Sequence, residues 1–364
     1  MRAMKKYIFR SVLLIGGLMV GVLLCELVAR FPAFPSDSDL LFNSPETSPM
    51  GLYVLDKEAR IIPASNFSAQ ARSLGFSSAL RTNQLGLRGP KTSEVKKEQW
   101  LALGDSFTMS VQVSEEQSFE GILGSEFKTH VWNGGVDGYS TWQATIRYKQ
   151  IKKSLPIKHV VLTFFTGNDF QDNDLFLVQK NHPLPGKPGD PIPREKTPSW
   201  KLFLLKYSYL YAHYRIYEQR SKIQTHIQQA QNWKQELSLF NDIGQQRLQR
   251  LSQKTEQALR ELKRVTQKDG VALTVAIAPP AFVVDQKRAN DTFKLVGLNP
   301  KQARLSAPQQ TVISILKRLG IRACDLTPAL QAQADGTYFV TDGHWTPKGH
   351  QIVAQTLKKC IEKQ

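Results

Sequence analysis

The sequence predicts a three-layer α/β sandwich with a mostly parallel central sheet, and two patterns carry this prediction. First, short apolar runs alternate with helical repeats from Trp100 to the C-terminus. Strands that alternate with helices are typical of parallel sheets covered on both faces. Second, the run Lys158–Phe165 is almost continuously apolar, as expected for a strand buried on both faces. The chain has 364 residues, enough for one large domain or two small ones.

The first thirty residues predict a membrane anchor. Met1–Arg10 is basic, Ser11–Cys25 is uncharged and apolar, and counted to Val28 the apolar stretch approaches the length of about 20 residues that spans a bilayer. The basic flank should stay in the cytoplasm, so we expect a single-pass protein of the inner (cytoplasmic) membrane with its main part in the periplasm. A cleaved signal peptide is the alternative, although Glu26 and Arg30 fit a cleavage site poorly.

Residues 31–98 are expected to form a linker and a small N-terminal region. Phe31–Pro49 is rich in proline and serine, which is typical of a linker. Residues 51–98 contain short apolar pieces separated by turn residues, and Leu80–Pro90 resembles a strand followed by a glycine-containing turn. We expect this region to pack on the main domain, which would run from residue 99 to residue 364.

The elements of the main domain follow from apolar spacing and turn residues. Strands are expected at Trp100–Leu103, near Val131, at Lys158–Phe165, at Gly270–Pro280 and at Gly320–Leu326. Helices are expected at Phe119–Phe127, Thr141–Ser154, Ala307–Leu319 and from Pro347 to about Lys363. Thr346 is a suitable N-cap for the last helix, with Pro347 at its first position.

Residues 180–265 form an insertion into this pattern. Residues 180–199 contain six prolines and predict a loop, and Trp200–Val265 is expected to be helical. One apolar face recurs every three or four residues through Ile223, Ile227, Ala230, Trp233, Leu237 and Phe240, and Tyr207, Tyr209, Tyr211, Tyr214 and Tyr217 precede it. Such a face either packs on its own domain or, with the tyrosines, rests on a membrane interface.

Charge and cysteine content restrict the possible partners. The net charge is +17, and +13 remains outside the first ten residues, which favours anionic partners such as a membrane surface or an acidic polymer. No zinc-finger spacing or RNA-binding signature is present, so no nucleic-acid partner is expected. Cys25 lies in the apolar stretch, whereas Cys324 and Cys360 either pair in an oxidising compartment or remain separate buried thiols. The oligomeric state is open.

Polar residues follow the predicted strands where the strands end. Ser106 follows the first strand, Gly138 the second and Asn168 the third, while Asp342 and His344 follow the last. One carboxyl edge of a parallel sheet can gather all of them. His344 could take the proton of the Ser106 hydroxyl, and Asp342 could orient the histidine ring. The backbone N–H groups of Ser106 and Gly138 and the amide of Asn168 could then hold an oxyanion.

Four stretches resemble the blocks of the SGNH (GDSL-type) hydrolase superfamily, from Trp100 to the end with 180–265 as an insertion. They are Gly104-Asp105-Ser106-Phe107, Asn133-Gly134-Gly135-Val136-Asp137-Gly138, Gly167-Asn168-Asp169 and Asp342-Gly343-His344. The resemblance implies an SGNH or flavodoxin-like fold. Family hydrolases usually place two residues between the acid and the histidine, and here only Gly343 intervenes. The form Asp342-x-His344-Trp345 is instead similar to SGNH-like proteins of bacterial exopolysaccharide O-acetylation.

The sequence therefore predicts a membrane-anchored, extracytoplasmic serine esterase acting on an ester-linked acyl group of an envelope glycan or lipid. One alternative is an O-acyltransferase that modifies an extracellular polysaccharide. A second is a binding or assembly component that keeps the fold without turnover. No cofactor is expected: Gly134-Gly135-x-x-Gly138 does not fit a phosphate-binding fingerprint. His350 could join Asp342 and His344 at a metal only with a ligand from elsewhere.

Overall fold

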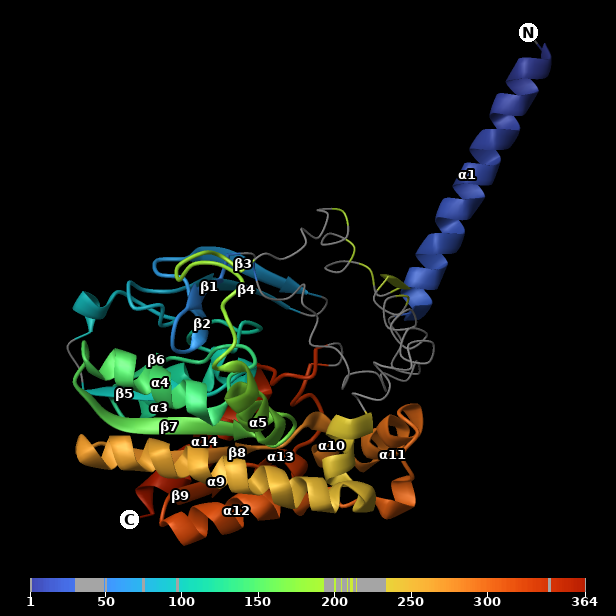
Figure 1. The fold of residues 1–364 in the computed structure, drawn as a ribbon. Helices are drawn as coiled ribbons and strands as arrows, with labels where there is room; N and C mark the ends of the chain where they lie inside the picture. The colour runs from blue at the N-terminus through green and yellow to red at the C-terminus, as the bar shows by residue number, and fades with distance from the viewer. Residues whose placement is uncertain are drawn as a thin grey trace.

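The computed structural model describes most of the chain outside the linker and part of the insertion (Figure 1). The described residues are 2–29, 49, 51–73, 76–95, 98–192, 200, 204, 208, 210, 211, 214, 234–339 and 342–363. The apolar positions expected at 223–233 and the tyrosines at 207, 209 and 217 lie outside this set, so the proposed membrane-facing surface of the insertion stays a prediction.

A five-stranded parallel sheet forms the centre of the molecule and confirms the predicted α/β architecture. Its strands are β5 (Gln99–Leu103), β6 (His130–Asn133), β7 (Ile157–Phe165), β8 (Ala272–Ala278) and β9 (Arg322–Asp325). They are ordered β6-β5-β7-β8-β9, all parallel. This is the flavodoxin-like order 2-1-3-4-5, in which the chain winds in opposite directions from the first strand. The crevice beyond the carboxyl end of β5 is therefore the favoured place for chemistry.

Helices cover both faces of the sheet (Figure 1). On one face lie α3 (Phe119–Glu126) and α14 (Pro347–Glu362), and on the other lie α4 (Thr141–Lys152), α5 (Asp169–Gln179), α9 (Gln245–Lys268) and α12 (Ala307–Leu319). Alternation along β5 divides the core: Leu101 and Leu103 join the cluster under α4, α9 and α12, whereas Trp100 and Ala102 join the cluster under α14. Shorter helices follow the last two strands: α10 (Ala281–Val284) and α11 (Gln286–Leu295) come after β8, and α13 (Thr327–Gln331) comes after β9.

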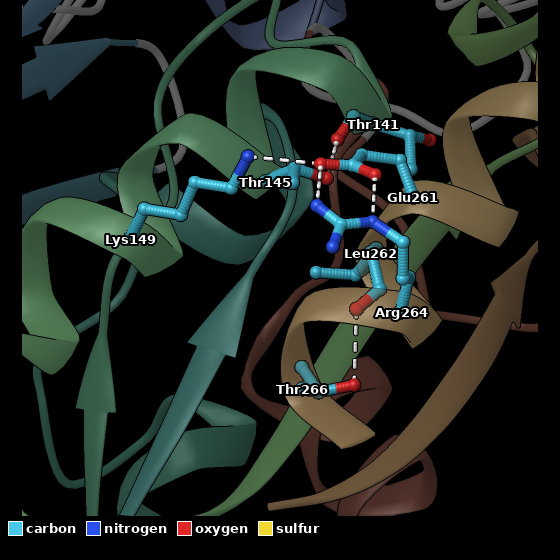
Figure 2. A network of polar contacts seen from close by, with 7 residues as sticks. All are labelled: Thr141, Thr145, Lys149, Glu261, Leu262, Arg264 and Thr266. Atoms are coloured by element: carbon cyan, nitrogen blue, oxygen red, sulfur yellow. Dashed lines mark hydrogen bonds and ion pairs between the residues drawn. The ribbon is translucent and has the colours of Figure 1, made fainter. Parts of the chain in front are cut away.

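The contact between α4 and α9 shows how the second layer is held (Figure 2). Glu261 of α9 accepts hydrogen bonds from Lys149 of α4, at 2.9 Å, and from Arg264, at 2.7 and 2.9 Å. The lysine and arginine side chains are largely exposed, so such pairs stabilise by at most about 1 kcal/mol. The larger contribution comes from the fully buried Leu259 and Leu262 on the inner face of α9.

Residues 51–95 form two antiparallel hairpins that share a core with the main domain. The strands are β1 (Tyr53–Asp56) with β2 (Arg60–Pro63), and β3 (Ser68–Ser73) with β4 (Phe76–Arg81), and a single turn η1 (Thr92–Glu94) follows. Leu52, Tyr53, Phe76 and Leu80 cluster with Met109, Val111, Val136 and Tyr139, which lie in the segments that follow β5 and β6. The hairpins therefore pack directly on the segments that carry Ser106 and Gly138.

The N-terminal segment forms a single helix, α1 (Arg2–Ala29), that projects away from the rest of the molecule in Figure 1. Within the part of the chain that the structure describes, no helix has both the length and the apolar character needed to cross a membrane. The predicted transmembrane helix is therefore not confirmed.

Two elements differ from the sequence-based expectation. The helix expected over Trp200–Val265 is not continuous, because two single turns, η2 (Ser238–Phe240) and η3 (Asp242–Gly244), precede α9. Asn241 between them is extended and its side chain accepts from the N–H of Ile243, which diverts the backbone from helical bonding. Helix α5 was not expected, because only Phe170 and Phe176 bury apolar surface there.

The two C-terminal cysteines are joined. Cys324 in β9 and Cys360 in α14 form a disulfide, with Cα atoms 5.9 Å apart. The sequence left pairing and separate thiols open, and the structure decides for pairing. The bond ties the edge strand of the sheet to the last helix.

Candidate active site

Three of the predicted residues meet in one hydrogen-bonded row. The Oγ atom of Ser106 lies 2.8 Å from Nε2 of His344, and Nδ1 of the same ring lies 2.6 Å from Oδ1 of Asp342. Asp342 and His344 are buried, whereas Ser106 is half-buried and is the member nearest to solvent. A proton on Nδ1 would be donated to the carboxylate, which leaves Nε2 free to accept from the serine hydroxyl. The row has the geometry of a nucleophile, a base and an orienting acid.

Ser106 is presented by a single helical turn after β5. Helix α2 (Ser106–Met109) starts at Asp105, whose Oδ1 accepts from the N–H of Phe107 at 2.9 Å. Gly104 precedes it with φ +148°, and a Cβ there would lie 2.5 Å from Oγ1 of Thr108 and 2.8 Å from the carbonyl oxygen of Thr163. Only glycine fits this backbone conformation and these close contacts, which explains Gly104. The acid at 105 is explained by its role as the N-cap of α2.

A short hydrogen-bonded loop carries the acid and the histidine. Gly343 adopts φ +76°, and its N–H donates to the carbonyl of Phe339, whose own N–H donates to the carbonyl of His344. The left-handed glycine folds the chain back, so that Asp342 and His344 face each other with one residue between them. The loop ends at Thr346, the N-cap of α14, whose Oγ1 accepts from the N–H of Gly349. The predicted cap is therefore confirmed.

The electrostatics of His344 suit a base that is oriented by a charge. Burial lowers the pKa of the imidazole, but the charge of Asp342 and the hydrogen bond to it outweigh burial and raise the pKa above its ordinary value. Asp105 and Asp137 act in the same direction. The aromatic ring of Phe107 lies against the imidazole, with ring centroids 4.8 Å apart, and limits its rotation.

The structure places the predicted oxyanion donors in the surrounding loops. Asn168 lines the same cavity as His344, and its Oδ1 is buried without a protein partner. Gly138 follows β6 with φ +71°, and a Cβ there would meet no protein atom within 4 Å. Glycine is therefore favoured at position 138 by the left-handed backbone conformation and not by crowding from other protein atoms. The crowded position is Gly135, where a Cβ would lie 2.3 Å from the amide nitrogen of Met109.

A cavity of about 280 Å³ adjoins the histidine. Its apolar lining includes three aromatic side chains, Phe107, Phe165 and Phe282. Its polar lining includes Asp172 and Glu236, which were not among the predicted residues, and burial raises the pKa of both carboxyl groups. Sequence spacing gave no signal for them, because Asp172 lies in the unexpected helix α5 and Glu236 in the insertion.

The remaining sequence candidates have structural roles. Nδ1 of His350 accepts from the N–H of Phe119 at 3.2 Å, and burial lowers the pKa of His350 to about 3. His350 thus packs in the core beside Trp345, which is also fully buried. Among the described residues, no group of three or more His, Cys, Asp or Glu side chains is arranged to hold a metal ion.

Comparisons with known proteins agree with the resemblance seen in the sequence blocks. Residues 239–364 match the family described as "SGNH hydrolase-like domain, acetyltransferase AlgX". The matched range contains Asp342 and His344 and begins after Ser106, Gly138 and Asn168. The sequence has no match among proteins of curated function.

Similar solved structures include several esterases. A putative G-D-S-L lipolytic protein from Desulfitobacterium hafniense is 12% identical, with a TM-score of 0.38, and the match covers 72% of this chain and 98% of that one. A variant of Axe2, an acetyl-xylooligosaccharide esterase from Geobacillus stearothermophilus, is 10% identical, with a TM-score of 0.40 and coverage of 73% and 95%. Esterase EstA from Pseudoalteromonas is 10% identical, with a TM-score of 0.39 and coverage of 73% and 97%.

Proposed function

We propose that this chain is an SGNH-type serine enzyme that takes an acyl group from an ester. The observation that carries the proposal is the row from Ser106 through His344 to Asp342, with contacts of 2.8 and 2.6 Å. Such a row activates a hydroxyl that is otherwise a weak nucleophile. The match of the C-terminal third to an SGNH hydrolase-like domain supports the same chemistry.

The reaction proceeds through an acyl-enzyme. His344 Nε2 takes the proton as Ser106 Oγ attacks the ester carbonyl carbon, and the carbonyl oxygen becomes an oxyanion held by the N–H groups of Ser106 and Gly138 and the amide of Asn168. The tetrahedral intermediate collapses, and the leaving alkoxide receives the proton from His344. Water, or a sugar hydroxyl in an acyltransferase, then attacks the acyl-enzyme with the same base. Asp342 stabilises the imidazolium formed in each half.

A labelling experiment tests this mechanism. The wild-type chain is expected to react with a fluorophosphonate probe and to turn over para-nitrophenyl acetate, while Ser106→Ala and His344→Ala lose both activities. Ser314→Ala is the matched control, because Ser314 is exposed on α12 and lies outside the site. Labelling that survives Ser106→Ala contradicts the mechanism. A folded wild-type chain that neither labels nor turns over favours the binding or assembly role.

The cavity beside the histidine favours an uncharged substrate group at that position. Asp172 and Glu236 line it, and burial already makes negative charge there costly. A substrate carboxylate would add a further negative charge in the same space. The group bound next to His344 is therefore a neutral acyl or hydroxylated group. The net charge of +17 acts at longer range and attracts the protein to an anionic surface.

The proposal places the enzyme outside the cytoplasm, at the inner membrane. The Cys324–Cys360 disulfide supports this location, because such bonds persist in oxidising compartments. Membrane attachment through the apolar stretch Ser11–Cys25 rests on the sequence alone. In a bacterium with a periplasm, protease added to spheroplasts should degrade the domain, and a maleimide should modify one thiol before reduction and three after it. A protease-resistant domain with three reactive thiols would place it in the cytoplasm.

A further inference from the structure

The helix that carries Ser106, α2, is too short to be stable on its own. It has four residues, and its backbone hydrogen bonds run from the amides of Thr108 and Met109 to Asp105 O and from the amide of Ser110 to Ser106 O. An isolated turn of this length is unstable, because nucleation fixes several residues for one hydrogen bond. Its C-cap, Ser110, has φ +53°, a conformation that costs a non-glycine residue about 1–2 kcal/mol. Contacts from elsewhere must therefore keep this turn in place.

One buried arginine makes most of these contacts. Arg88 comes from the segment after β4 and is 3% exposed. Its Nη1 donates to the carbonyl oxygens of Met109, at 3.0 Å, and Ser110, at 2.5 Å, and its Nη2 donates to that of Val113. The last carbonyls of a helix have no intrahelical donors and carry partial negative charge. A guanidinium spreads five N–H donors over a planar fork and can reach carbonyls that lie apart, whereas an ammonium group presents three donors around a single atom.

Asn133 at the end of β6 completes the support. Its Nδ2 donates to the carbonyl of Thr108, at 2.5 Å, and to Oε1 of Glu120, at 3.2 Å. Its own carbonyl accepts from the backbone N–H of Arg88 at 3.0 Å. The carbonyls of three consecutive residues, 108 to 110, are thus held by the side chains of two residues whose backbones are hydrogen-bonded to each other.

The charge of Arg88 is directed to this turn. Burial of a guanidinium is costly unless hydrogen bonds compensate it, and burial lowers the pKa of Arg88. The nearby Glu120 is itself buried, and burial raises its pKa to about 8, so it is mostly protonated at neutral pH. The charges of Glu120, Glu115 and Glu116 offset part of the cost of burial. The hydrogen bonds that compensate the buried cation come from the backbone carbonyls at the end of the nucleophile turn, residues 106–110, and from that of Val113.

We infer that Arg88 is a positioning residue, which fixes the direction of the Ser106 hydroxyl by holding the far end of helix α2. The inference rests on the proposed function for its kinetic consequences but has a structural readout of its own. It also makes the N-terminal hairpin region part of the catalytic unit, since Arg88 lies before the sandwich begins at β5.

Arg88→Lys tests the inference, with Arg147→Lys as the matched control. Arg147 is equally buried at 3% exposure and also donates to a backbone carbonyl, that of Leu85, but makes no hydrogen bond to α2. In Arg88→Lys we expect kcat for para-nitrophenyl acetate to fall by about 10- to 100-fold, with KM changed less than about twofold, because misplacement of a reacting group acts mainly on the chemical step. Fluorophosphonate labelling should slow by the same factor, while Arg147→Lys, at a similar loss in melting temperature, should keep the wild-type kcat.

Hydrogen exchange separates the two proposals. The amides of Met109 and Ser110 should exchange at least about tenfold faster in Arg88→Lys than in the wild type and in Arg147→Lys, because exchange follows local opening. This result holds even if the wild type fails to react with either probe, which would overturn only the proposed function. Unchanged exchange together with a wild-type kcat in Arg88→Lys overturns the positioning role. An equal loss of kcat in both lysine variants overturns it as well and assigns Arg88 to stability alone.

Discussion

At the scale of single residues, the contribution of Asp342 to the rate can be measured most directly. Its Oδ1 receives both the Nδ1 contact and the backbone N–H of His344, so it sets the tautomer and the ring direction. Asp342→Asn should lower kcat by about 10³- to 10⁴-fold without unfolding the protein, because an amide can present its N–H and favour the wrong tautomer. The exposed Asp335→Asn in the same loop is the control. A loss of less than tenfold would remove Asp342 from the catalytic row.

The pH dependence of the rate belongs to His344. The base must be neutral, and the pKa of this histidine is raised above 6.5 by Asp342 against the effect of burial. The kcat/KM should therefore rise with pH through a midpoint above 6.5 and then level off. In Asp342→Asn the cause of the upward shift is removed, so the midpoint of the residual activity should move down. Identical midpoints in the two proteins would contradict this assignment.

At the scale of elements, the loop after β6 packs closely against the nucleophile turn, residues 106–110, because the residue at the contact is a glycine, Gly135. A Cβ at Gly135 would lie 2.3 Å from Met109 N and 2.7 Å from Thr108 C, which are backbone atoms that cannot yield without moving α2. Gly135→Ala should lower the melting temperature and reduce fluorophosphonate labelling at least about tenfold, since overpacking a tight contact displaces backbone. Gly297→Ala, which has φ +69° and open space, should lose only stability. Equal labelling of the two variants would show that the contact is not needed for catalysis.

Helix α3 carries a buried acid whose proton stabilises the fold. Burial raises the pKa of Glu120 to about 8 from an ordinary 4.5. The stability contributed by this proton is complete below pH 4.5 and is lost as pH rises through 8, at up to about 1.4 kcal/mol per pH unit. Urea unfolding at pH 5, 7 and 9 should show Glu120→Gln gaining on the wild type as pH rises. A difference between Glu120→Gln and the wild type that stays constant over this pH range would refute the prediction.

The elements that could be predicted from sequence are those whose signal is local. The apolar runs gave β5 and β7, the spacing over Ala307–Leu319 gave α12 with its bounds unchanged, and Thr346-Pro347 gave the start of α14. The meeting of Ser106, Asp342 and His344 followed from the rule that parallel strands share a carboxyl edge.

The features that escaped prediction depend on contacts between distant segments. The contacts of Arg88 with residues 109–113 span more than twenty positions, and no local pattern marks them. The pairing of Cys324 with Cys360 depends on how β9 and α14 approach each other. The break at Asn241 was hidden because Leu237 and Phe240 continue the helical apolar spacing up to it, and both residues are buried in the core as the spacing implied.

At the scale of the whole molecule, the hairpin region and the sandwich form one folding unit. Leu52, Tyr53, Phe76 and Leu80 are buried against Met109, Val111 and Tyr139, and Arg88 holds the nucleophile turn. Burial of such side chains contributes about 2 kcal/mol each, so losing four of them consumes a large part of the 5–15 kcal/mol that stabilises a typical domain. Without the hairpins, the apolar side chains of the segments after β5 and β6 would also be exposed to water.

A fragment that begins at residue 99 should therefore fail to fold into an active domain, even though it contains the sheet and all three residues of the catalytic row. We expect the fragment 99–364 to aggregate or to bind a hydrophobic dye, and to show no fluorophosphonate labelling. The fragment 51–364 is the control, because it keeps the buried residues of both hairpins and Arg88, and it should label at the wild-type rate. The two fragments are compared by size-exclusion chromatography and by labelling. A monomeric 99–364 that labels as fast as 51–364 would show that the sandwich positions Ser106 without the hairpins, and it would separate the two regions into independent units.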